Sequence, residues 1–565
     1  FEELLEELHL KRVIGNEELI AMGIGLGANI ASYANFYKNK ELKFSKIILI
    51  SPYNRYKCDY RISREIGKFN IPTHIFYGQF DKINDVKVRY ALYSNAKNNP
   101  NVHFSCYPAT GYFLYYSSKM SLEHDELFNG SGVSVLVGES RKDTPTFLPE
   151  VPEYNEPFFK HLFNTIEGIE NPKRIALLTD TPPVFINGVE TVVELLQKQL
   201  NKMGYEAYVV ALWHKQYDLD VLPNDHFVPI FGKYARYVKG YKELALLKST
   251  NYQRDAHELA MFGFSYLHLH TEYSMSQVAL ELSKITNIRM PYTFHTIWKM
   301  YYEHKFGKLA GEVTYKAAKD LFFDEIYKAC PTIIVPSMKS YQVLMSDSSK
   351  KKDVRIIPSP VNPNNFTLTK SDRLEINKLR VKYKLMGKKV LGYVGRVSTE
   401  KNIMETIKYI SEVVSEIPNL IFMVVGVGDA TKQLIKYAKK LKVNEHIIYV
   451  GQVPNEQVKY YYQLFDVFVT ASNFETQGIT YFEAASSGTL ILAKKDKAIE
   501  GVFEDGETAY VYDGFESWLE RLEKALFSDN KAITDTAKNM MKQYSPEKWA
   551  KKMLSIYTEL NPDKK

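Results

Sequence analysis

The chain has 565 residues, which at roughly 150 residues per domain predicts a protein of several domains. Hydrophobic residues make up 45% and charged residues 25%, so a disordered, collagen-like or coiled-coil chain is excluded. Three cysteines are too few for a disulfide framework or a zinc site, and no run approaches the roughly 20 apolar residues that span a bilayer. The net charge of +7 permits an anionic partner without requiring one. We expect a globular protein of the reducing cytoplasm, with residues missing upstream of Phe1.

Residues 1–127 alternate short β-branched runs with amphipathic stretches, which predicts the strands and helices of a parallel sheet. The turn signal Asn129-Gly130-Ser131-Gly132 follows, and residues 141–157 contain four prolines. Because prolines disfavour the interiors of helices and sheets, we predict a linker over residues 128–170.

Residues 171–375 and residues 376–545 each alternate strands with helices, which predicts two Rossmann-like α/β domains. The final helix, 546–562, is expected to pack back on the first of them. The second domain has the more regular pattern, with successive apolar runs separated by amphipathic stretches. Sheets of this kind bind ligands beyond the carboxyl ends of their strands, so a site is expected in the loops that follow the strands.

The segment NFETQGITYFEAASSG carries two glutamates, Glu475 and Glu483, eight residues apart. Gly478 permits close backbone approach, and the amides of Gly478, Ile479 and Thr480 begin a helix, where a diphosphate can bind. Glu483, inside that helix, can accept hydrogen bonds from two ribose hydroxyls. The alternative is that two surface glutamates have this spacing by chance.

Arg396 and Lys401 follow the first strand of the same domain, in the segment GRVSTEKN. Two fixed cations beside a helix N-terminus would stabilise charge on a departing diphosphate. A pair of solvated surface cations is the alternative. Gly426 and Gly428 follow the next strand and are a weak turn signal by themselves.

The motifs GRVSTEKNI, VVGVGDA and FETQGITYFEAASSG resemble the donor half of family-4 retaining glycosyltransferases. These enzymes have the GT-B architecture, in which two Rossmann-like domains face a cleft. The resemblance, which covers roughly residues 172–560, implies a nucleotide-diphosphate sugar donor, most often UDP-linked, and no metal or other cofactor. It matches Glu475 and Glu483 to the family's paired glutamates and Arg396 and Lys401 to its two cations.

The resemblance also assigns site residues. The catalytic candidates are Arg396, Lys401, Glu475 and His295, and the donor-binding candidates are Gly188, Gly395, Gln477, Gly478, Ile479, Thr480 and Glu483. Gly188 belongs to an Asn-Gly pair that could equally be an ordinary turn. His295 and His270 both follow predicted strands, and the family places a histidine matching His295 near the donor sugar. We expect no metal site, and we interpret Asp218-Leu219-Asp220 as a surface loop.

The segments TDTPP, HTEYS, FHT and ETQG are most similar to 1,2-diacylglycerol 3-glucosyltransferases, which glucosylate a membrane lipid from the cytoplasmic face. Residues 233–242 and 297–308 interleave cations with tyrosine and tryptophan, a composition that suits an anionic lipid surface. The predicted contacts to the acceptor or the membrane are Lys233, Arg236, Tyr237, Lys239 and Lys299. A solvated lysine face, or a surface that binds a protein acceptor, is the alternative.

In the first block, Gly23-Ile24-Gly25-Leu26-Gly27 resembles the nucleophile elbow of an α/β-hydrolase, with Gly25 at the nucleophile position. Asp81 matches the acid of that family, and Tyr112 replaces its histidine. Without the serine and the histidine there is no acyl chemistry, so we predict a degenerate, partial hydrolase-like domain over residues 1–127 that serves binding or assembly. A Rossmann-type glycine loop is the alternative interpretation.

The sequence therefore predicts an α/β enzyme that transfers a hexose, expected to be glucose, from a nucleotide sugar such as UDP-glucose to a membrane lipid such as diacylglycerol. We expect it to be peripheral on the inner face of the membrane and to bind no nucleic acid. One alternative is a glycosyltransferase for a surface or secreted protein, for which the first block would be an additional module. A non-catalytic scaffold is the other, and the intact set of two cations and two glutamates argues against it.

Overall fold

The computed structural model describes residues 18–36, 43–52, 62–78, 86–108, 156–180, 182, 188–213, 226–231, 233–234, 247–248, 252–347 and 352–564. The chain divides into two compact units. The first consists of the residues up to Pro291 together with Lys328–Cys330 and Tyr557–Lys565. The second consists of Tyr292–Tyr327 and Pro331–Ile556. None of the helices that the structure describes is long and apolar enough to span a bilayer.

The first unit contains a four-stranded parallel sheet in the order β1-β2-β3-β4. Its elements are β1 (Glu18–Ile24), α2 (Leu26–Ser32), β2 (Lys43–Ile50), α3 (Ile62–Glu65), β3 (Thr73–Gly78), α4 (Val86–Ala96) and β4 (Val102–Tyr107). The predicted alternation of strands and helices in the first block is therefore present.

A sharp turn joins β1 to α2. Gly25 has φ 58° and ψ −118°, and a Cβ on Gly23 would lie 2.2 Å from the carbonyl oxygen of Gly27. Only glycine fits positions 23 and 25 without displacing the backbone, whereas a Cβ on Gly27 would meet open space. The hydrolase-like interpretation remains a prediction, because Asp81 and Tyr112 lie outside the described residues.

Part of the range predicted to be a linker forms a helix, α7 (Glu156–Glu167). The last of the prolines, Pro157, falls in the first turn, where a proline is tolerated. Phe158 and Leu162 follow at helical spacing and pack with Ile48 and Phe76 of the four-stranded sheet. The proline count concealed this amphipathic helix, so the linker prediction is wrong for residues 156–167. Residues 128–155 lie outside the described residues.

A second set of parallel strands in this unit runs in the order β10-β5-β6-β7. The elements are β5 (Arg174–Thr179), α8 (Gly188–Lys202), β6 (Glu206–Trp213), β7 (Phe227–Phe231), the short hairpin β8 (Lys233–Tyr234) and β9 (Leu247–Lys248), α9 (Tyr252–Ala260), β10 (Phe264–Leu269) and α10 (Ser274–Thr286). Every residue of β5 and β6 is buried, as expected of central strands that are covered on both faces. The end of α22 (Pro546–Leu560) contacts this set, where the Tyr557 hydroxyl lies 2.7 Å from Nδ1 of His268.

A buried polar network connects the two sheets of the first unit. Glu206 lies 2.5 Å from Nε2 of His161 and 3.1 Å from Nε of Arg174. Arg174 also donates to the carbonyl oxygens of Cys106, in β4, and Phe262, both at 2.9 Å. Although burial alone would raise it, hydrogen bonding to His161 and the nearby Arg174 lower the pKa of Glu206 to about 2. The ionised carboxylate therefore holds together elements from three separate parts of the chain.

The second unit contains β11 (Tyr292–Thr293), β12 (Thr332–Val335) and β13 (Asp353–Ile356) as neighbouring parallel strands. The helices of this part are α11 (Trp298–Phe306), α12 (Lys308–Ala318), α13 (Asp324–Ala329) and α14 (Met338–Asp347). α12 passes into a π-helical turn over Lys319–Phe323.

The rest of the second unit is a six-stranded parallel sheet in the order β16-β15-β14-β17-β18-β19. The strands are β14 (Lys389–Val394), β15 (Leu420–Val425), β16 (Ile447–Gly451), β17 (Val467–Thr470), β18 (Leu490–Lys494) and β19 (Tyr510–Tyr512). The helices are α15 (Lys370–Lys382), α16 (Ile403–Val413), α17 (Thr431–Lys440), α18 (Val458–Tyr462), α19 (Ile479–Ser487), α20 (Phe515–Phe527) and α21 (Lys531–Met540). This is the doubly wound order, so the predicted α/β class is confirmed.

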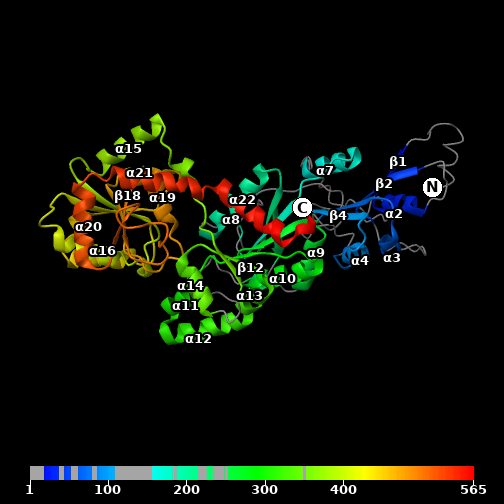
Figure 1. Cartoon of the computed structure of the whole chain (residues 1–565), viewed down its shortest axis with the longest axis horizontal. Helices are drawn as coiled ribbons and strands as arrows, with labels where there is room; N and C mark the ends of the chain where they lie inside the picture. The colour runs from blue at the N-terminus through cyan, green and yellow to red at the C-terminus, as the bar shows by residue number, and fades with distance from the viewer. Residues whose placement is uncertain are drawn as a thin grey trace, which may run out of the picture. The chain divides into compact units, whose positions relative to one another are not determined.

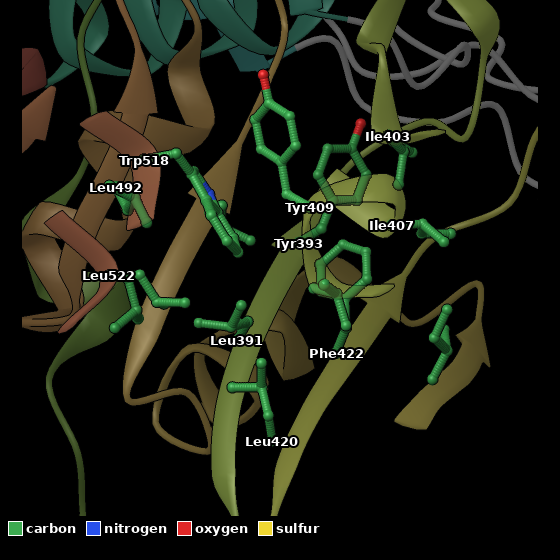
Figure 2. Packing of buried hydrophobic residues seen from close by; sticks show 14 of the residues in the cluster. Leu391, Tyr393, Ile403, Ile407, Tyr409, Leu420, Phe422, Leu492, Trp518 and Leu522 are labelled. Carbon is green, nitrogen blue, oxygen red and sulfur yellow. The ribbon is translucent and has the colours of Figure 1, made fainter. Parts of the chain in front are cut away.

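Successive side chains of each strand lie on opposite faces of the six-stranded sheet, and apolar side chains are buried on both faces. Leu391 packs with α16 and α20 on one face, and Val390 packs with α18, α19 and α21 on the other (Figure 1). Figure 2 shows Trp518 of α20 beside Tyr409 of α16, whose ring centroids are 5.2 Å apart, with Leu391 close by. This core fixes the strand ends from which the loops of the site emerge.

The buried network of the first unit makes a stability prediction. Replacing Glu206 with alanine leaves the Arg174 guanidinium buried without its carboxylate and should cost about 3–5 kcal/mol of unfolding free energy. Since the pKa of Glu206 is depressed, its contribution is present above the unfolded value of about 4.3 and is lost as pH falls towards 2. Thermal unfolding of the full chain between pH 7 and acid pH measures both effects.

The control is Glu194→Ala, which breaks an exposed pair with Lys198 and should cost about 0–1 kcal/mol. If the Glu206 and Glu194 variants unfold at the same temperature, the network does not hold the sheets together.

Candidate active site

The loops that follow β14 and β17 lie side by side, because these two strands are neighbours at the centre of the six-stranded sheet. The strand order reverses between them, and this switch point is where doubly wound sheets bind ligands. The predicted residues Gly395, Arg396 and Lys401 are in the loop after β14, and Glu475 is in the loop after β17. The fold thus brings together groups that are about 75 residues apart in the sequence.

Lys401 and Glu475 form an ion pair with 2.8 Å between Nζ and Oε1. Burial on its own would raise the pKa of the Glu475 carboxyl, but the Lys401 ammonium and the Ser472 hydroxyl reverse the sign and hold that pKa below its ordinary value. Glu475 is therefore an ionised acceptor at neutral pH, suited to hydrogen bonds from hydroxyl groups.

Arg396 lies at the same edge and is held by Glu400. Its Nη2 atom is 3.1 Å from Oε1 of Glu400, and 55% of its side chain remains exposed. Glu400 is nearly buried, accepts a hydrogen bond from Ser398 at 2.5 Å and has His304 of α11 3.4 Å away. The guanidinium is thus positioned by a fixed carboxylate while it stays accessible to an anion.

Glu400 and His304 were not predicted as site residues. Glu400 lies within the motif GRVSTEKNI, so its position was visible, but its role depends on a contact with α11 that spacing does not encode. His304 also lies 3.1 Å from Thr399 Oγ1 and packs its ring 5.5 Å from that of Phe474. α11 therefore touches both loops of the site.

The glycines after β15 permit close packing of backbone loops. A Cβ on Gly426 would lie 1.9 Å from the carbonyl oxygen of Gly395, and one on Gly428 would lie 2.1 Å from that of Val397. Gly426 also has φ 129°, which other residues rarely adopt. The weak turn signal in the sequence thus corresponds to a tight contact that sets the position of the loop bearing Arg396.

Gly478 is the N-cap of α19, and Ile479 and Thr480 are its first residues. Gly478 has φ 79°, and a Cβ there would lie 2.3 Å from the ring of Tyr481. Farther along α19, Glu483 accepts a hydrogen bond from the Tyr462 hydroxyl at 2.8 Å. Burial raises the pKa of Glu483 to about 7, and the Tyr462 hydroxyl offsets part of that rise.

The loop before α19 is held by Gln477, which was predicted to bind the donor, and by three side chains that the sequence did not indicate. Gln477 exchanges two hydrogen bonds with the backbone of Ser359, at 2.8 and 3.1 Å, so its side chain braces the loop. Ser337 and Ser340 both donate to the carbonyl oxygen of Thr476, at 2.5 and 3.2 Å. Lys339 adds contacts of 2.6 Å to the Asn473 carbonyl oxygen and 2.7 Å to Asp496.

His295 follows β11, and burial lowers the pKa of its imidazole to about 4, so the ring is neutral at physiological pH. Lys299 is partly buried in α11. Gly188 is the exposed first residue of α8 in the first unit. Lys233 falls in β8, of whose side chains nothing is described, and Arg236, Tyr237 and Lys239 lie outside the described residues.

Asp180, in the TDTPP segment, and His270 have structural partners in the first unit. Asp180 accepts hydrogen bonds from the amides of Tyr273 and Met275, at 3.0 and 2.8 Å, and so caps the start of α10. His270 is fully buried with its ring 4.0 Å from that of His268. Across the described ranges, no group of three or more His, Cys, Asp or Glu side chains is placed to hold a metal ion.

Two parts of the chain match known protein families. Residues 375–553 match glycosyl transferases group 1, and residues 186–365 match glycosyltransferase family 4. Among solved structures, HepE from Anabaena in complex with UDP and glucose superposes with a TM-score of 0.52 at 15% identity, covering 68% of this chain and 100% of that one. Sucrose-phosphate synthase from Thermosynechococcus elongatus gives 0.56 at 18% identity, with 69% and 100% covered. The chain is a glycosyltransferase of family 4 with the GT-B fold.

The similar curated proteins are more specific in name. The α-monoglucosyldiacylglycerol synthase of Acholeplasma laidlawii is 28% identical over 395 residues, which cover 68% of this chain and 97% of that protein. The α-monoglucosyldiacylglycerol synthase of Streptococcus pneumoniae is 25% identical over 394 residues, covering 68% and 86%.

Gly478 offers a test of the loop geometry. Gly478→Ala should destabilise the second unit by about 1–3 kcal/mol for the left-handed backbone and by about 1–3 kcal/mol more for the clash with the Tyr481 ring. Gly387→Ala is the matched control, because Gly387 has φ 71° but open space around it, and it should cost only the backbone contribution. Denaturant unfolding measures the difference, and equal losses would refute the clash.

Proposed function

We propose that this protein is a retaining glycosyltransferase that transfers glucose from UDP-glucose to the free hydroxyl of diacylglycerol. The observation that carries the proposal is the set of Arg396, Lys401 and Glu475 at the switch point of the six-stranded sheet, beside the N-terminus of α19. The donor is supported by HepE, whose structure holds UDP and glucose, and the acceptor by the two α-monoglucosyldiacylglycerol synthases.

In the proposed sugar transfer, stabilisation of developing charge matters more than a covalent nucleophile from the protein. As the bond between the anomeric carbon and the diphosphate oxygen breaks, negative charge builds on the diphosphate and positive charge on the sugar. Arg396, Lys401 and the amides of Ile479 and Thr480 would stabilise the diphosphate. The acceptor hydroxyl then attacks the same face of the sugar and gives its proton to the departing phosphate oxygen.

The remaining side chains would orient the donor. Glu475, ionised and held by Lys401, can accept hydrogen bonds from the sugar hydroxyls. Glu483 can accept them from the ribose hydroxyls. His295, neutral because of its low pKa, would offer the sugar a hydrogen bond without adding a positive charge next to the developing cation.

The assignment makes a kinetic prediction. Lys401→Ala should lower kcat about 10²- to 10³-fold, because it removes a cation from the departing diphosphate and leaves Glu475 unpaired. Lys408→Ala, an exposed lysine of the following helix, should leave kcat unchanged. The assay measures sugar transfer from a panel of UDP- and GDP-sugars to detergent-dispersed diacylglycerol. Transfer to protein in a cell lysate and none to the lipid would refute the acceptor and leave the donor site standing.

Glu483 makes a pH prediction. A carboxyl with a pKa of about 7 must lose its proton to accept two hydroxyl hydrogen bonds, so UDP-glucose affinity should fall about tenfold per unit as pH drops below 7 and level off above it. UDP-glucose is the better ligand for this measurement than UDP, because its diphosphate diester does not titrate in this range. Calorimetric titrations should give Glu483→Gln weaker binding with a flat profile. A flat profile in the parent protein would exclude this role.

A further inference from the structure

An exposed apolar stripe runs along α12. The side chains of Leu309 and Val313 are 84% and 70% exposed, which is unusual for large aliphatic residues. They are four residues apart and therefore share one face of the helix. Phe306, just before α12, and Leu321, just after it, are exposed as well. The opposite face of α12 is already packed against α11.

The inward face of α12 explains why the stripe is left outside. A Cβ on Gly311 would lie 2.4 Å from the backbone of Glu303, so α12 packs closely on α11 there. Tyr315 and Ala318 are buried on the same side. At 100° per residue these positions lie opposite Leu309 and Val313. The stripe is therefore surplus to the folding of the hairpin formed by α11 and α12.

Charge on the same hairpin points to an anionic partner. Residues 298–323 contain five lysines, at 299, 305, 308, 316 and 319, against three carboxylates, at 303, 312 and 320. Lys316 lies on the same face as the stripe and is well exposed, although it forms a surface ion pair of 3.5 Å with Glu312. Aliphatic side chains flanked by lysines match a bilayer, in which apolar groups enter below the headgroups and lysines meet anionic lipids.

The hairpin is also joined to the candidate active site. The last turn of α11 carries His304, which contacts Thr399 and Glu400 in the loop that bears Arg396. Gly307, with φ 80°, then reverses the chain into α12. A surface that begins within a few residues of the donor loops is well placed for an acceptor that never leaves a bilayer.

We propose that α12 is the surface by which this protein lies on an anionic lipid bilayer, with Leu309 and Val313 inserted below the headgroups. The purpose of this contact rests on the proposed lipid acceptor, whereas its test does not. Insertion of two aliphatic side chains and contact of the neighbouring lysines together hold the protein at the surface.

The test is flotation of the full chain with vesicles of phosphatidylcholine and phosphatidylglycerol that contain no diacylglycerol. The double variant Leu309→Glu, Val313→Glu should lose at least tenfold in vesicle affinity, because it replaces buried apolar area with charge of the lipid's own sign. The parent's affinity should fall with added salt and with omission of phosphatidylglycerol.

The matched control is Leu374→Glu, Val381→Glu on α15, where both side chains are also exposed, at 64% and 71%, among lysines and arginines. It should bind vesicles as the parent does. UDP binding in solution should be unchanged in both double variants, which shows that they are folded. Equal vesicle binding by the α12 variant and the parent would overturn the proposal, as would a change confined to oligomeric state.

The outcomes separate this proposal from the proposed function. If vesicle binding depends on α12 but no sugar reaches diacylglycerol, the surface stands and the acceptor falls. If diacylglycerol in detergent is glucosylated while the α12 variant binds vesicles normally, the acceptor stands and the surface falls.

Discussion

The candidate active site depends on how closely its backbone loops approach one another. The loop after β15 lies so near the loop after β14 that a single carbon atom on Gly426 or Gly428 would collide with a carbonyl oxygen. Glycine at these points sets the place of the segment bearing Arg396 and Lys401. The same requirement recurs at Gly478, where the chain enters α19. Charge placement in this enzyme therefore follows from the absence of side chains as much as from their presence.

Paired charges then fix what the backbone leaves free. Lys401 and Arg396 each have a carboxylate partner, Glu475 and Glu400, and each partner is more buried than the cation it holds. A cation held in this way pays little conformational entropy when an anion arrives. The first unit uses the same kind of pair for a different purpose, since Glu206 and Arg174 there connect two sheets.

Local patterns predicted much of this structure. The apolar runs of the second Rossmann-like block gave its strands, and because parallel strands end at one edge, they also brought Arg396, Lys401 and Glu475 to one place. The positioning residues escaped prediction. Ser337 acts on a carbonyl group 139 residues away, and His304 on a loop 95 residues away. No local rule of spacing encodes such contacts, which arise only when separate elements pack.

The contact of His304 with Thr399 and Glu400 has a thermodynamic consequence. Because His304 belongs to the hairpin and contacts the donor loop, its freedom can depend both on donor binding and on the binding of α12 to a surface. If binding at one of these two sites alters the freedom of His304, the binding free energy at the other site changes, and the coupling is equal in both directions. Nucleotide sugar would then tighten the hold of α12 on its surface by the same factor as that surface tightens the hold on nucleotide sugar. The affinity of the enzyme for its donor would then depend on whether α12 is bound to its surface.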